Sequence, residues 1–248
     1  MGMFRQIRIG ISTDDLYYGN ILAMTIAEAN DDYITVIGSE WTYPIADIAD
    51  AWRARLIQPG YHTHLTLRDK GACKAIILLL AVMLESYSLR ASTDNIHDED
   101  VAKTNKFLVR DWWESCDYED IGDVLDIFVI RDALAHNLLY SYSEDWQSNK
   151  RSVYSHIKGG EKLFKNRVAK GKLKHTDLSC NPDTIGPKDV IGVAKITEQA
   201  LRYLSENYPG IGKVDFNFAK RGKSKNLWGC IEDVANEAIK LIDSGDKL

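Results

Sequence analysis

Residues 75–84 of the chain read AIILLLAVML, a run that is apolar on every side of a helix. It lies within a helical pattern that extends from about Leu67 to Leu89. A helix that is apolar all round is normally buried among other elements, so we expect this one at the centre of a helical bundle. The apolar run is about half as long as a membrane span requires, so we predict no membrane segment here.

Helical signals continue on both sides of this central segment. Proline residues that can open a helix, and Pro-Gly pairs that end one, divide the chain into further helices. The other helices are expected at about 13–30, 44–58, 101–112, 119–140, 187–208 and 228–242, with a short strand at 33–37. Two polar segments, SVYSHI and KLFKNRV, flank Gly159-Gly160 and predict a β-hairpin across that turn.

The predicted fold class is therefore mainly α, a helical bundle with a small β-hairpin insertion. We divide the chain into an N-terminal helical extension, residues 1–62, and a helical bundle, residues 63–248. The bundle carries a basic insertion at 143–186.

Composition excludes several broad classes. The chain has 248 residues, of which 45% are hydrophobic and 27% charged, as in an ordinary globular protein rather than a disordered chain or a coiled-coil rod. The four cysteines form no C-x-x-C pair and no export signal is visible, so we predict a reduced, cytoplasmic protein without a zinc site. The sequence has no P-loop, G-x-G-x-x-G or G-x-S-x-G motif, which argues against common nucleotide-binding and serine-hydrolase classes.

Charge is spread unevenly along the chain. The formal net charge is −5, yet residues 151–180 contain eight basic and only two acidic side chains. One interpretation is a solvated loop or hairpin, because charge runs usually face water. The other is local binding of a polyanion, which an acidic protein can achieve through one basic segment.

The stretch with the clearest chemical content is Ile121–Tyr140, IGDVLDIFVIRDALAHNLLY. In a helix of this sequence, Arg131, Asp132 and His136 interrupt a surface that is otherwise apolar on most sides. Burying such groups without partners costs several kcal/mol, so they should be paired with one another or line a cleft. The alternative to a functional site is an internal Arg131–Asp132 ion pair beside a core histidine.

The spacing of these residues suits phosphate chemistry. Asp132 and His136 are neighbours on a helix at i and i+4, and a carboxylate beside an imidazole fixes its tautomer and raises its basicity. The guanidinium of Arg131 has the planar fork that binds phosphate oxygens, and Asn137 can add a donor. Glu85 follows the apolar run of the central helix, and we expect it either beside this site or at the edge of the core.

The segment RDALAHN resembles the signature of HEPN domains, in which Arg is followed by four to six residues and then His, often with a polar residue after the Arg. Arg131, Asp132 and His136 match those positions. The segment AIILLLAVMLES resembles the first core helix of the family, with Glu85 as its acidic residue. The same Arg-to-His spacing recurs at Arg151–His156, Arg90–His97 and Arg55–His62, but not within an apolar helix. The resemblance covers about residues 67–208 and implies a HEPN-like bundle.

The resemblance implies a metal-independent endoribonuclease that needs no cofactor, in which the RNA 2′-hydroxyl attacks the adjacent phosphate. His136 would be the general acid or base, Arg131 would stabilise the transition state, and Asp132 would orient His136. Asn137 would join an RNA-binding set with the basic residues of the insertion, namely Arg151, Lys158, Lys162, Lys165 and Arg167.

The resemblance also implies partners. Catalytic HEPN domains form homodimers, and a second apolar face at Ile127, Ile130, Leu134 and Leu138 would suit such an interface. Family members include toxins and phage-defence effectors, which implies an antitoxin or another regulatory partner. Two alternatives stay open: a non-catalytic HEPN-like module for RNA binding or regulatory dimerisation, and a structural helical protein with a buried polar network.

Overall fold

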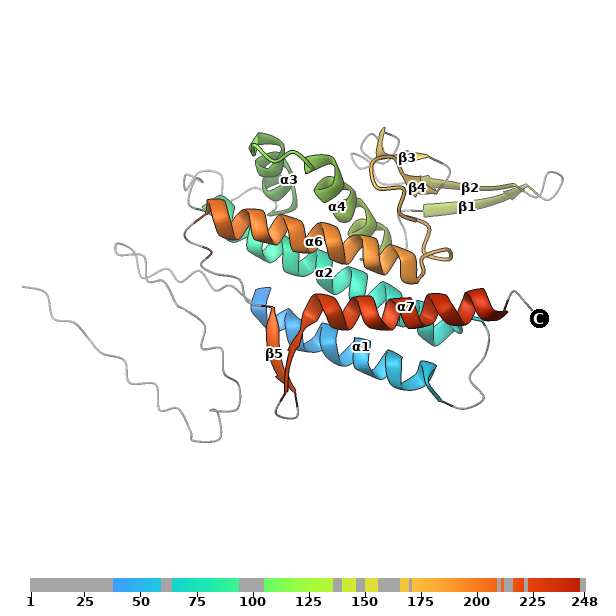
Figure 1. Ribbon diagram of the computed structural model, residues 1–248. Coiled ribbons are helices and arrows are strands. Elements are labelled where there is room, and N and C mark those ends of the chain that lie inside the picture. Colours follow the sequence, from blue (N-terminus) through green and yellow to red (C-terminus); the bar gives the residue numbers. More distant parts are fainter. Residues whose placement is uncertain are drawn as a thin grey trace, which may run out of the picture. The chain divides into compact units, whose positions relative to one another are not determined.

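Six α-helices account for most of the chain that the computed structural model describes (Figure 1). The described residues are 38–58, 64–93, 105–135, 140–145, 150–155, 166–169, 171–208, 211, 216–220 and 223–245. They belong to one compact unit, Ile37–Leu248. The helices are α1 (Thr42–Leu56), α2 (Leu67–Thr93), α3 (Asn105–Ser115), α4 (Ile121–Ala135), α6 (Pro187–Asn207) and α7 (Leu227–Gly245). The predicted mainly α class is confirmed.

Side-chain caps set the start of two of these helices. The backbone N–H of Thr66 donates to Asp69 Oδ2 at 2.8 Å, and the N–H of Asp69 donates to Thr66 Oγ1 at 3.3 Å. This reciprocal pattern satisfies donors that the first turn of α2 leaves without intrahelical partners. At α6, Pro187 takes the first helical position, and Asp189 accepts a hydrogen bond from the N–H of Gly186 at 2.8 Å. Both helices begin where the sequence predicts.

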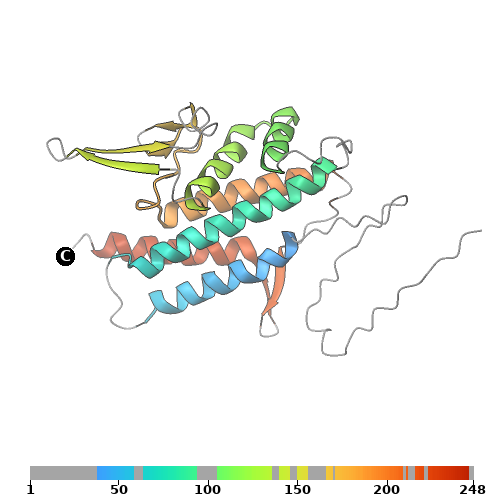
Figure 2. The same ribbon diagram turned by 180° about the vertical axis from the view of Figure 1, so that it is seen from behind.

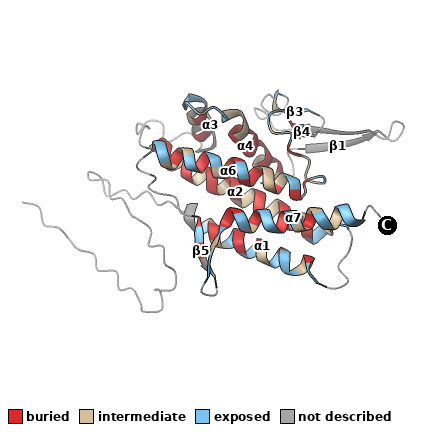
Figure 3. Ribbon diagram, viewed as in Figure 1, coloured by how far each residue is buried: buried red, intermediate tan, exposed pale blue. Residues whose placement is uncertain are grey.

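Helix α2 is the central helix of the bundle. It packs against α1, α3, α4 and α6, and it lies behind α6 in Figure 1 and in front of it in Figure 2. Several of its apolar side chains, among them Ile76, Leu80 and Leu84, are fully buried, and buried residues of α2 and α6 are coloured red in Figure 3. By length and composition alone α2 could cross a membrane. Here other helices cover much of its apolar surface, as is typical of a core helix.

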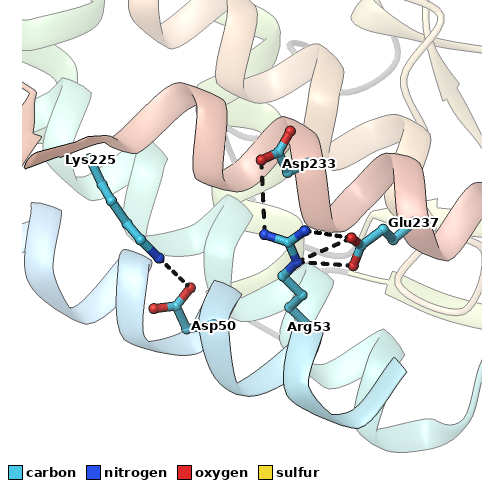
Figure 4. Close-up of polar contacts among 5 residues, drawn as sticks. All are labelled: Asp50, Arg53, Lys225, Asp233 and Glu237. Carbon is cyan, nitrogen blue, oxygen red and sulfur yellow. Dashed lines mark hydrogen bonds and ion pairs between the residues drawn. The ribbon is translucent and has the colours of Figure 1, made fainter. Parts of the chain in front are cut away.

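Helix α1 packs on α2 and α7. The Nη2 atom of Arg53 lies 2.7 Å from Glu237 Oε1, and Lys225 Nζ lies 3.5 Å from Asp50 Oδ1, so ion pairs join α1 to the α7 region (Figure 4). The predicted division after residue 62 assigned this helix to an N-terminal extension. The structure instead places α1 inside the bundle, because its apolar face, including Ile45 and Trp52, is buried.

The strands within the described residues form three separate antiparallel pairs. They are β1 (Tyr140–Asp145) with β2 (Lys150–Ser155), β3 (Val168–Ala169) with β4 (Lys172–Leu173), and β5 (Asn217–Lys220) with β6 (Lys223–Asn226). The hairpin predicted across Gly159-Gly160 is therefore wrong in its pairing: the segment SVYS pairs with the preceding strand β1. Both pairings leave a loop of four residues, so loop closure does not favour one over the other. The observed partner strand contains Tyr140 and Tyr142, residues of a type that favours strand structure. Gly171, at φ +78°, lies in the tight turn before β4.

Helix α4 is shorter than predicted. It ends at Ala135, and Tyr140 already pairs with Ser155 in the β1–β2 hairpin, so the helix cannot continue to Tyr140. The helix predicted at 13–30 and the strand predicted at 33–37 lie outside the described residues.

Candidate functional site

The candidate site is built on the last turns of α4. This helix packs against α2, α3 and α6, and every residue from Val124 to Ile130 is buried. Arg131 and Asp132 follow directly, with side chains that are 12% and 14% exposed. Both are therefore largely withdrawn from water at the border of an apolar core.

Carboxylates surround the guanidinium of Arg131. Its Nη1 atom donates a hydrogen bond to Glu85 Oε2 of α2. Its Nε and Nη2 atoms lie 3.3 Å and 3.2 Å from Asp132 Oδ1. The Cζ atom also lies 5.8 Å from the ring centroid of Phe128. Glu85, which we expected either beside the site or at the edge of the core, is thus in direct contact with Arg131.

The position of Arg131 near the end of α4, between two carboxylates, is electrostatically favourable. The C-terminal end of a helix carries partial negative charge, which favours a cation such as Arg131 near the end of α4. Two carboxylates neutralise the guanidinium and fix its plane, so it is aimed rather than mobile. A guanidinium fixed in this way can present its remaining N–H groups to phosphate oxygens.

A second arginine reaches the same cluster from α3. Arg110 Nη2 lies 4.0 Å from Asp132 Oδ2, and the Arg110 side chain is 12% exposed. The pKa of Arg110 is lowered, chiefly because burial disfavours the charged form; the nearby Asp132 opposes this shift and the Arg131 charge adds to it. Glu85, Arg110, Arg131 and Asp132 form what we call the arginine–carboxylate cluster, with two positive and two negative groups.

An adjacent contact holds part of the insertion against α4. Asp126, which is fully buried, accepts a hydrogen bond from Arg167 Nη1 at 3.0 Å and from Thr176 Oγ1 at 3.2 Å. The same Arg167 atom donates to the Gly122 carbonyl at 3.0 Å. Arg167 was predicted to contact RNA; in the structure it attaches the β3 region to α4, and the RNA contact stays a prediction.

Several predicted site residues cannot be placed. His136, Asn137, Lys158, Lys162 and Lys165 lie outside the described residues, and of Arg151 only the backbone, in β2, is described. The predicted contact between Asp132 and His136 therefore stays a prediction.

Asp126 and Arg110 did not figure among the sequence-predicted site residues. Asp126 carries a detectable signal, because it is a lone acid between Leu125 and Ile127 in an apolar helix. Arg110 carries little signal, because it belongs to a charged helix that also contains Asp111 and Glu114. Only its packing beside α4 reveals it.

Two residues of the second apolar face of α4, Ile127 and Ile130, are fully buried within the single chain. Leu134 is half-buried, and Leu138 lies outside the described residues. The homodimer stays a prediction.

Among the described residues, no group of three or more His, Cys, Asp and Glu side chains is arranged to hold a metal ion. Comparison of the chain with protein-family models, with curated proteins and with solved structures found no match.

Proposed function

We propose that the protein is a metal-independent endoribonuclease of the HEPN type, acting in the cytoplasm as a toxin or phage-defence effector. The observation that carries the proposal is the position of Arg131, which two carboxylates hold at the border of the core, five residues before His136. A fixed guanidinium that a histidine follows closely in the sequence suits phosphate-ester cleavage, because it can stabilise charge that develops on the phosphate.

In this proposal His136 either accepts the proton of the 2′-hydroxyl as general base or donates a proton to the leaving 5′-oxygen as general acid. The 2′-oxygen forms a bond to phosphorus as the bond to the 5′-oxygen breaks, leaving a cyclic phosphate and a 5′-hydroxyl. Glu85 and Asp132 hold Arg131 in place. Asn137, Arg151, Lys158, Lys162 and Lys165 bind the RNA backbone, and a homodimer and an antitoxin or another regulatory partner complete the proposal.

The proposal is tested by incubating RNA with the protein in EDTA. Wild type and the control variant His64→Ala, which changes an exposed histidine on the bundle, should release products with a cyclic phosphate. His136→Ala should release none while keeping the same melting temperature. Full activity of His136→Ala would place the chemistry elsewhere.

One observation favours a second candidate, a non-catalytic module for RNA binding or regulatory dimerisation. All three nitrogen atoms of the Arg131 guanidinium contact a carboxylate, which leaves it less positive toward RNA than a free arginine. RNA binding by wild type without turnover would support this candidate. A large loss of stability in Arg131→Ala, about 3–5 kcal/mol, with neither binding nor turnover in wild type would leave only a structural role for the cluster.

A further inference from the structure

The two arginines of the arginine–carboxylate cluster differ in how well they are satisfied. Each nitrogen of the Arg131 guanidinium contacts a carboxylate. Arg110, by contrast, makes one distant ion pair, 4.0 Å from Asp132, and donates no hydrogen bond within the described part of the chain. Its Nε atom is buried there without a hydrogen-bond partner.

Burying the Nε–H of a guanidinium without a hydrogen bond is unfavourable, because this donor has left water and gained nothing in exchange. Burial accordingly lowers the pKa of Arg110. Native proteins satisfy nearly all buried donors, so an exception of this kind points to a strained or functional group or to a missing ligand. The side chain retains 12% exposure, so a ligand can reach it from solvent.

We propose that Arg110 is a phosphate-binding residue, which takes a phosphate group of the RNA substrate beside Arg131. This inference rests on the proposed ribonuclease function, and it names a residue of α3 that the Arg-to-His motif does not include. The planar fork of arginine matches two phosphate oxygens, and an anion would accept hydrogen bonds from the Nη groups, which Asp132 leaves without one. In this assignment Glu85 and Asp132 position Arg131. Arg110 carries the positive charge that carboxylates neutralise less, because its one carboxylate partner lies 4.0 Å away.

The test compares Arg110→Met and Arg110→Lys with the control variant Arg68→Met, which removes an exposed arginine of α2. Three quantities are measured: the melting temperature, kcat and KM for RNA cleavage in EDTA, and the affinity for a 2′-O-methyl RNA oligonucleotide, which cannot be cleaved by 2′-oxygen attack. Affinity is measured at several salt concentrations.

Arg110→Met should melt at or above the temperature of wild type, because methionine keeps much of the packing and removes the buried donors. Its kcat/KM should fall by about a hundredfold or more, as expected for removal of a charge-stabilising donor at a transition state. Its RNA affinity should fall at least tenfold. The slope of log affinity against log salt concentration should become shallower by the contribution of about one phosphate contact. Arg110→Lys should keep that salt dependence but have a lower kcat, because lysine lacks the fork.

Different outcomes separate this inference from the proposed function. If wild type cleaves RNA and Arg110→Met cleaves and binds equally well, the inference is wrong and the proposed function stands. A lower melting temperature, with activity reduced only in proportion to the folded fraction, would also overturn it. If wild type binds RNA without cleaving it, the ribonuclease proposal fails, and the RNA affinity of Arg110→Met then tests the inference about Arg110. Weaker binding than wild type supports the inference, and equal binding overturns it. Wild type that neither binds nor cleaves RNA would overturn both.

Discussion

Arg167 donates a hydrogen bond to the fully buried carboxylate of Asp126 at 3.0 Å. This contact joins the residue that precedes β3 to the same helix that carries Arg131, at a position five residues before it. The basic insertion is therefore attached to the candidate site through a buried charge pair. Such a pair stabilises little compared with an apolar contact, but breaking it leaves an uncompensated charge inside the protein.

Asp126→Asn should destabilise the protein by about 3–5 kcal/mol, because Arg167 then loses its counter-charge in a largely buried position. The free energy of unfolding in urea measures this change. The double variant Asp126→Leu, Arg167→Met should recover most of the loss, since no charge remains unpaired. A loss below about 1 kcal/mol in the single variant, a value typical of exposed pairs, would show that the contact is solvated.

Glu85→Gln tests how Arg131 is positioned. The amide keeps an oxygen that can accept the Arg131 hydrogen bond but removes one negative charge from the cluster. RNA should bind several-fold more tightly, because one unit charge at short range near a protein surface is worth about 1 kcal/mol or more. If the protein cleaves RNA as proposed, kcat should fall by about tenfold, because a neutral acceptor holds the guanidinium less firmly. Steady-state kinetics in EDTA separates the two effects, and a kcat equal to wild type would show that Glu85 does not position Arg131.

Two glycine-to-alanine changes should have opposite effects on stability. In Gly192→Ala the new Cβ would lie 2.5 Å from Leu178 Cδ2, a buried side chain, so overpacking should cost about 1–3 kcal/mol despite the better helix propensity. In Gly71→Ala nothing lies within 4 Å of the new Cβ in α2, so stability should rise by about 0.5–1 kcal/mol. Thermal unfolding of both variants checks this, and a stabilised Gly192→Ala would show that Leu178 moves freely.

Tyr87 should make the protein sensitive to alkali. Burial raises the pKa of this phenol from 10.0 to about 12, and the side chain is buried in α2. The unfolded chain releases the proton near pH 10, while the folded protein holds it until about pH 12, so stability falls as pH rises between these values. At about pH 12 this difference in pKa should have lowered the free energy of unfolding by about 2–3 kcal/mol.

Tyr87→Phe removes this proton and should flatten the dependence of unfolding free energy on pH above 10. The matched change Tyr43→Phe removes the hydroxyl of a half-buried tyrosine of α1 and serves as the control. Equal slopes for all three proteins would show that Tyr87 ionises normally in the folded state.

The sequence alone determined where most helices lie, and it showed that charged residues interrupt the apolar helix α4. The apolar run 75–84 specifies a central helix, because the spacing of residues along the sequence decides which side chains share a helix face. Capping residues such as Thr66 with Asp69, and Pro187 at a first helical position, mark where helices start within a few residues. The presence of Arg131 and Asp132 in an apolar helix is likewise visible in the sequence. These features depend on residues that lie within one or two turns of each other.

Only the tertiary structure decided which distant segments meet. It placed α1 inside the bundle, paired β2 with β1, and brought Glu85, Arg110 and Asp132 around Arg131 although they come from three helices. It likewise joined Asp126 to Arg167. Such contacts depend on how whole helix faces pack against one another. The sequence around a charged residue looks the same whether that residue faces water or a buried carboxylate. The composition of the cluster is therefore a property of the packed fold.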